Sequence, residues 1–104
     1  MGKRLTVDEL RITKASYYRT PNPVTDAGAI AHGDGIALVT DGKGRSVRLR
    51  FATVFDPSTG IFTADIKAPT GWDVSGIRPD VLHNAAAEYV RQEIRKQASG
   101  TQMP

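Results

Sequence analysis

Hydrophobic and polar residues alternate along two consecutive segments in the middle of the chain. In residues 45–55, the apolar side holds Val47, Leu49, Phe51 and Phe55, and the polar side holds Ser46, Arg48 and Arg50. In residues 61–68, Phe62, Ala64 and Ile66 oppose Thr63, Asp65 and Lys67. A period of two is typical of a strand with one buried face, so both segments are predicted to be half-buried β-strands.

Turn-forming residues bracket these strands. Residues 41–44 read Asp-Gly-Lys-Gly and follow the short apolar run 35–40, which predicts a third strand and a hairpin turn. Residues 56–60 read Asp-Pro-Ser-Thr-Gly and predict a second chain reversal, with Asp56 as a turn residue. Consecutive strands joined by short turns predict an antiparallel meander.

The N-terminal part of the chain allows two interpretations. Residues 6–9 have the Thr-x-x-Glu spacing of a capping box, which favours a helix. Leu10, Ile12 and the β-forming residues 13–18 favour a strand instead, and we predict a strand. Residues 20–35 contain two prolines and three glycines and predict a long, mobile loop of the kind that is often functional when ordered.

A helix is predicted after Pro79, which suits a first helical turn. Residues 81–97 contain neither proline nor glycine, and their apolar residues return at spacings of three and four. Gly100 offers a stop, and residues 99–104 are expected to form a flexible tail. The predicted core consists of Leu38, Val47, Leu49, Phe51, Phe62, Ile66, Leu82, Tyr89 and Ile94.

These elements predict one α+β domain over residues 1–98, with a three- to four-stranded antiparallel sheet packed against one C-terminal amphipathic helix. A chain of 104 residues is near the usual length of a single domain. It contains no cysteine, no apolar run long enough to cross a membrane and no apolar stretch after its basic N-terminus that would form a signal peptide. We therefore expect a cytoplasmic protein without disulfides and without membrane association.

No pattern in the chain indicates catalysis. The glycine pairs at 33–35 and 42–44 have neither the dinucleotide nor the P-loop spacing. His32 falls in the predicted loop and His83 at the predicted helix start, and no local spacing links them as a metal or acid–base site. We expect a non-catalytic binding protein without a cofactor or a metal ion.

The polar side of the predicted sheet is basic. The net charge of +3 mildly favours an anionic partner. The candidate nucleic-acid-binding residues are Lys43, Arg45, Arg48, Arg50 and Lys67, with Tyr17 and Tyr18 as stacking platforms. The alternative is a solvated outer face on which Asp65 pairs with Arg48 or Arg50 and one tyrosine is in the core.

Three segments resemble parts of nucleic-acid-binding families. Three strands followed by a helix carrying Asn84-Ala85-Ala86-Ala87 resemble the second half of double-stranded RNA-binding domains, but residues 79–82 lack the lysines that begin the helix in that family. The order of sheet and then helix is similar to small single-stranded DNA-binding coactivator domains. Residues 12–19 resemble the recognition helix of a helix-turn-helix, although too few residues precede them to form its partner helices.

A protein-interaction role is the competing interpretation. A sheet covered on one face only leaves its other face and its edges available to a partner. The protein would then be an inhibitor, an adaptor or an assembly subunit, for example an inhibitor encoded by a phage or another mobile element. Trp72 is a candidate interface anchor, although it can also fold back over the core. Ala85, Ala86 and Ala87 would allow close helix packing in a homodimer.

Overall fold

The computed structural model describes residues 3–4, 7–21 and 28–101, with side chains from residue 7 to residue 98 within those ranges. The strands are β1 (Lys3–Arg4), β2 (Glu9–Thr20), β3 (Ile30–Thr40), β4 (Ser46–Asp56), β5 (Ile61–Lys67) and β6 (Trp72–Asp73), and the helix is α1 (Pro79–Thr101). Strands β2 to β5 form a four-stranded antiparallel sheet in sequence order, which is a meander. The short strands β1 and β6 pair in parallel.

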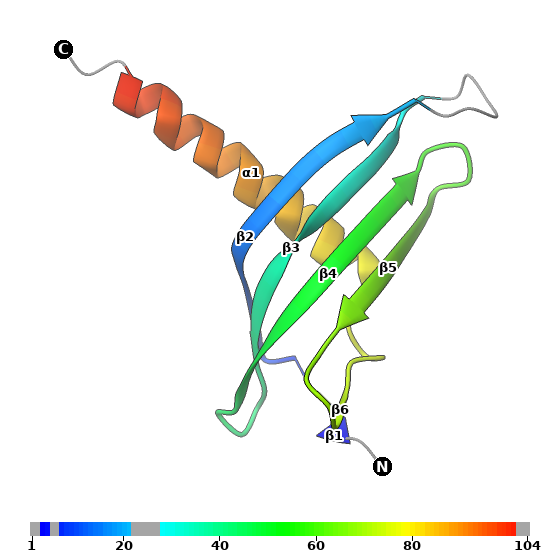
Figure 1. The fold of residues 1–104 in the computed structure, drawn as a ribbon, viewed down its shortest axis with the longest axis vertical. Helices are drawn as coiled ribbons and strands as arrows, with labels where there is room; N and C mark the ends of the chain where they lie inside the picture. Colours follow the sequence, from blue (N-terminus) through cyan, green and yellow to red (C-terminus); the bar gives the residue numbers. More distant parts are fainter. Residues whose placement is uncertain (1–2, 5–6, 22–27, 102–104) are drawn as a thin grey trace.

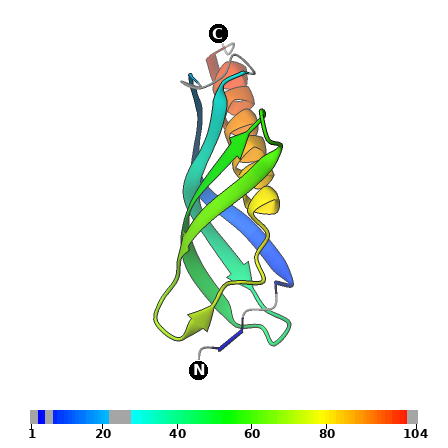
Figure 2. The ribbon, with the colours of Figure 1, turned by 90° about the vertical axis from the view of Figure 1, so that its right-hand side faces the viewer.

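The helix covers only one face of the sheet. It lies behind the strands in Figure 1, runs diagonally across them and extends beyond β2 at its C-terminal end. Turned by a quarter, the molecule shows the helix along one side of the sheet and, among the described residues, no element along the other (Figure 2). The predicted α+β architecture, a meander sheet with one C-terminal helix, is confirmed.

The core lies between this covered face and the helix. Its buried apolar side chains are Ala37, Val39, Val47, Leu49, Phe51, Ile77, Leu82 and Ala86. The alternation predicted for β4 is observed, because residues 47, 49, 51 and 53 are buried while 46, 48, 50 and 52 are exposed. Phe62 and Ile66 of β5 are half-buried on the same face. Tyr89 of the helix is also half-buried.

Two members of the predicted core are wrong. Leu38 pairs with Arg48 and therefore points to the uncovered face, while its neighbours Ala37 and Val39 fill the core. Ile94 of the helix is 60% exposed and therefore does not belong to the core. Leu38 belongs to a continuous apolar run, in which hydrophobic and polar residues do not alternate. The sequence therefore does not show which residues of this run face the core.

The predicted loop 20–35 is also wrong in its extent. Strand β2 continues to Thr20 and strand β3 already begins at Ile30, so Gly33 and Gly35 are strand residues. A Cβ at Gly33 would lie 2.9 Å from Thr53 Oγ1, and one at Gly35 would lie 2.2 Å from the Lys14 carbonyl oxygen. Both glycines therefore permit close approach within the sheet rather than a turn. Residues 22–27, the centre of the predicted loop, lie outside the described residues.

At the chain ends, the strand predicted for the N-terminal segment is confirmed as β2, so the helix-turn-helix interpretation of residues 12–19 is wrong. The alternative capping box includes Thr6, which lies outside the described residues. The helix begins where Pro79 predicts and continues through Gly100 to Thr101, so Gly100 does not end it. Residues 102–104 of the predicted tail lie outside the described part of the chain.

Within the described residues, α1 lacks the apolar composition that a membrane-spanning helix requires. The cytoplasmic location inferred from the sequence stays a prediction.

Candidate nucleic-acid interface

The uncovered face of the sheet, which we call the outer face, carries a band of basic side chains. Directly paired residues of antiparallel strands point to the same side, so the strand register identifies the members of each face. Arg11 pairs with Leu38, which pairs with Arg48. In the next row, Lys14 pairs with Ile36, Ile36 with Arg50 and Arg50 with Lys67. The basic band is defined as Arg11, Lys14, Arg48, Arg50 and Lys67.

The basic band is exposed and its charges are available. All five side chains belong to exposed residues. None of the ion pairs found among the described residues involves a member of the band. The ion pair expected between Asp65 and Arg48 or Arg50 is absent from them, because Asp65 lies opposite Ala52, one row away from Arg50.

Further along the strands, the outer face carries an aromatic row. Tyr18 pairs with His32 across β2 and β3, and their rings stack with centroids 4.7 Å apart and planes inclined by 6°. The Tyr18 hydroxyl donates to Asp34 Oδ2 at 3.2 Å, and Thr20 Oγ1 lies 2.9 Å from His32 Nε2. The negative charge of Asp34, partial burial and this hydrogen bond raise the pKa of Tyr18, which keeps its phenol protonated. Tyr18 is 46% exposed, so its ring remains accessible.

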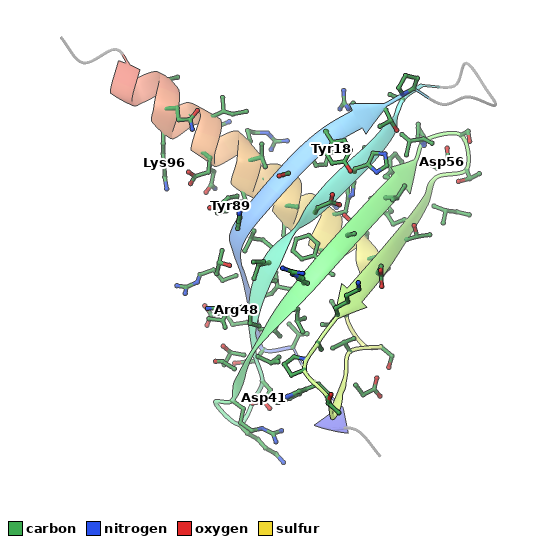
Figure 3. All side chains as sticks on the ribbon, viewed as in Figure 1. Tyr18, Asp41, Arg48, Asp56, Tyr89 and Lys96 are labelled. Atoms are coloured by element: carbon green, nitrogen blue, oxygen red, sulfur yellow. The ribbon has the colours of Figure 1, made fainter. Side chains whose placement is uncertain are left out.

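A groove on the outer face extends from the basic band toward the ring pair. Its volume is about 350 Å³, and its lining includes Lys14, Arg50 and Lys67 at the basic end and Asp34 and Asp65 at the other. Along the strands, Arg48 lies nearer the Asp41 end of the sheet and Tyr18 nearer the Asp56 end (Figure 3). The outer face therefore presents basic, acidic and aromatic rows in that order.

Tyr17, predicted beside the arginines, lies on the opposite face. It pairs with Gly33, and its hydroxyl lies 3.1 Å from Nε2 of His83 on the helix. The predicted pair of stacking tyrosines is therefore reduced to Tyr18, whose partner is His32. Adjacent residues of a strand necessarily point to opposite faces, so only one of two neighbouring tyrosines can serve the outer face.

Arg45 is engaged within the fold rather than available for phosphate. Its Nε lies 2.7 Å from Asp41 Oδ2, and its guanidinium carbon lies 5.4 Å from the centre of the Trp72 ring. Asp41 also accepts from the backbone N–H groups of Lys43 and Arg45. Burial alone raises the pKa of Asp41, but these hydrogen bonds and the Arg45 charge outweigh it and lower the pKa. Lys43 at this turn is exposed and belongs to none of the ion pairs found among the described residues.

Trp72 folds back over the core. It is half-buried, packs against the core cluster and lies beneath Arg45. Ala86 is likewise buried against the sheet. Trp72 therefore lacks the free surface that an interface anchor would need. Ala85 and Ala87 are half-buried, and the homodimer stays a prediction.

The two histidines lie on opposite faces of the sheet and do not form a joint site. His32 belongs to the outer face, whereas His83 is 2% exposed beneath the covered face. Thr53 Oγ1 donates to the Gly33 carbonyl at 2.7 Å and lies 3.0 Å from His83 Nδ1. Because the Thr53 hydroxyl has already donated its proton, Nδ1 carries the hydrogen and Nε2 accepts from Tyr17.

Sequence reasoning missed Arg11, Lys14, His32 and Asp34 as outer-face residues. A β-bulge between Ile12 and Lys14 changes the parity of β2, so Arg11 and Lys14 share a face although they are three residues apart. His32 and Asp34 were hidden in the predicted loop. Their signal in the sequence is the alternation of the small residues Ala31, Gly33 and Gly35 with His32 and Asp34.

Comparisons with known proteins give no match. No family model, no curated protein and no solved structure is significantly similar to the chain. The functional interpretation of the outer face rests on the geometry and charge of its own residues.

Proposed function

We propose that this protein is a non-catalytic binding protein that holds single-stranded nucleic acid on the outer face of its sheet. The observation that carries the proposal is the convergence of the basic band, which draws its five cations from β2, β4 and β5 onto the one face that the helix leaves open. Unpaired cations concentrated on one face favour binding to a polyanion, because each neutralised phosphate releases counterions.

The aromatic row favours a single strand over a duplex. Bases of a single strand can stack on exposed side-chain rings, whereas the bases of a duplex are already stacked on one another. Tyr18 and His32 offer such a ring surface on the same face as the basic band, beyond the acidic row. Arginine suits the phosphate-binding part because its planar fork donates two parallel hydrogen bonds to phosphate oxygens.

The outer face also supports a second candidate function, binding of a protein partner. Ile36, Leu38 and Val54 are half-buried on this face, and Ile61 at its edge is 57% exposed. An acidic partner with an apolar strip would match the basic band and these side chains. Such a partner would depend on Leu38 and Ile61 at least as strongly as on the arginines.

The decisive experiment compares binding of labelled single-stranded and double-stranded DNA and RNA at two salt concentrations. Replacing both Arg48 and Arg50 with alanine should weaken single-strand binding by about a hundredfold or more, since each of the two charged hydrogen bonds contributes about 1.5–3 kcal/mol and about 1.4 kcal/mol corresponds to a tenfold change in affinity. The slope of log affinity against log salt should fall by about 1.4, which corresponds to two lost phosphate contacts.

The matched control removes two arginines elsewhere. Arg91 and Arg95 are exposed on the helix, so the Arg91→Ala/Arg95→Ala variant has the same net charge as the Arg48→Ala/Arg50→Ala variant. The control should bind like the wild type. Equal losses in both double variants would reduce the effect to net charge, and absence of binding by the wild type at low salt would leave the protein-partner function.

A further inference from the structure

The groove on the outer face is built for a ligand that carries both negative charge and hydrogen-bond donors. Its basic end holds Lys14, Arg50 and Lys67, and its other end holds the carboxylates of Asp34 and Asp65. Carboxylates repel phosphate, so a face that only bound phosphates would gain nothing from two of them in this position. Their presence calls for a ligand group that donates hydrogen bonds.

The two carboxylates flank a single small residue. Ala52 pairs with Asp34 on one side and with Asp65 on the other, so both acids lie in one row across β3, β4 and β5. Strands are spaced by about 4.8 Å, which puts the two Cα atoms roughly 10 Å apart. Ala52 stands between the acids and its side chain is a methyl group, so the floor of the groove is low there.

Both carboxylates retain free acceptor capacity. An ionised carboxylate offers about four lone-pair sites. Asp34 uses Oδ2 to accept from Tyr18, which leaves Oδ1 for a ligand. Asp65 is exposed, and no hydrogen bond or ion pair found within the described ranges engages its side chain.

Nucleobases differ in the donors that they can offer such acceptors. Cytosine, adenine and guanine carry exocyclic amino groups, and carboxylates accept from these groups, as in the pairing of Asp or Glu with the cytosine N4 amine. Thymine presents carbonyl oxygen where cytosine presents that amine, and a carboxylate repels this oxygen. Uracil has the same carbonyl.

We propose that the groove is a nucleobase subsite that selects amino-bearing bases over thymine and uracil, with Asp34 and Asp65 as the acceptors. The inference rests on the proposed function, because the basic band must hold the flanking phosphates for a base to reach the groove. The Tyr18–His32 ring pair lies in the next row and offers a stacking surface to the neighbouring base.

The test compares oligo(dC) with oligo(dT) of one length, because these pyrimidines differ where the amino group replaces the carbonyl. The wild type should bind oligo(dC) about tenfold more tightly, which is the low end of the discrimination expected from base contacts. The Asp34→Ala/Asp65→Ala variant should lose this preference and bind oligo(dT) at least as tightly as the wild type does. The Asp65→Ala single variant should lose part of the preference.

Two variants separate the subsite from general charge effects. Glu88→Ala/Glu93→Ala removes two negative charges from the helix and should leave the preference for oligo(dC) unchanged. Arg48→Ala/Arg50→Ala should weaken both oligonucleotides equally. Equal binding of oligo(dC) and oligo(dT) by the wild type overturns the base selectivity alone, whereas failure of the wild type to bind any oligonucleotide overturns the proposed function as well.

Discussion

The two faces of the sheet are made by the same strands and differ in almost every physical property. Val39 and Leu49 on the covered face are completely buried, as is Leu82 of the helix that packs against it, and Thr53 on this face is hydrogen-bonded within the fold. In the described part of the chain, no buried side-chain nitrogen or oxygen lacks a partner. The outer face instead displays unpaired cations beside carboxylates and a ring pair. The basic band is exposed and is therefore free of the packing constraints that fix the covered face.

Residues that stabilise the fold and residues that are available for binding therefore alternate within one strand. Arg48 and Leu49 are neighbours in β4 and point to opposite faces. The burial of Leu49 contributes to the free energy of unfolding, whereas the charge of Arg48 faces solvent. A pair of substitutions at these adjacent positions can therefore test the distinction directly.

The largest expected effect is on stability, from the covered face. Leu49 is 0% exposed, so Leu49→Ala should lower the free energy of unfolding by about 2–5 kcal/mol through lost burial and the cavity that remains. Urea denaturation followed by circular dichroism measures this loss. Under conditions where the variant stays folded, its affinity for single-stranded DNA should be unchanged.

Its counterpart is Arg48→Ala on the outer face. This variant should change the free energy of unfolding by no more than about 0.5 kcal/mol, as is usual for an exposed site, while it weakens DNA binding. A large loss of stability in Arg48→Ala would show that the outer face is packed in solution, and the separation of the two faces would then be wrong.

The sequence predicted the face on which a residue lies wherever hydrophobic and polar residues alternate along a strand. Strands β4 and β5 have a strict period of two, so their faces could be assigned from the residue order, and Arg48, Arg50 and Lys67 were placed correctly. Strand β2 could not be assigned in this way, because its bulge after Ile12 arises from pairing with β3 and changes the parity of all later residues.

Features made by distant residues were also beyond sequence reasoning. His83 is hydrogen-bonded to Tyr17, 66 positions away, and to Thr53, 30 positions away. The glycines of β3 were interpreted as turn formers, because the sequence does not show which backbone will pass close to them. The structure gives the reason in each case, since a neighbouring strand occupies the space that a Cβ would need.

Gly35 gives the next effect in size. A Cβ there would lie 2.2 Å from the backbone oxygen of Lys14, and a backbone oxygen cannot move aside as a flexible side chain can. We expect Gly35→Ala to destabilise the protein by about 1–3 kcal/mol, the usual cost of overpacking. Thermal or urea denaturation measures the change.

The matched control for Gly35 is Gly42 in the β3–β4 turn. A Cβ at Gly42 would meet no atom within 4 Å, and Gly42 is not among the glycines with positive φ. Gly42→Ala should therefore leave the free energy of unfolding nearly unchanged. A stable Gly35→Ala variant would show that the bulge in β2 relaxes away from β3 at little cost.

The smallest expected effect is the pH dependence of the free energy of unfolding, to which the two histidines should contribute differently. Burial, and then the nearby charge of His32, lower the pKa of His83 below its ordinary value, so the folded protein holds this imidazole neutral. The unfolded chain binds a proton at about pH 6.5 and the folded chain only at lower pH. The free energy of unfolding should therefore be constant above this value and fall as the pH drops below it.

Urea denaturation at about pH 7.5 and about pH 5.5, on either side of the ordinary histidine pKa, measures this decline. His83→Gln should lower stability at both pH values, because Tyr17 and Thr53 lose their shared partner, but it should remove most of the difference between them. His32→Gln on the outer face should keep most of the difference, since burial of His83 is the larger cause of its lowered pKa. If His32→Gln abolished the decline and His83→Gln preserved it, the proton-sensitive group would lie on the outer face, and the covered face would not control stability in this range of pH.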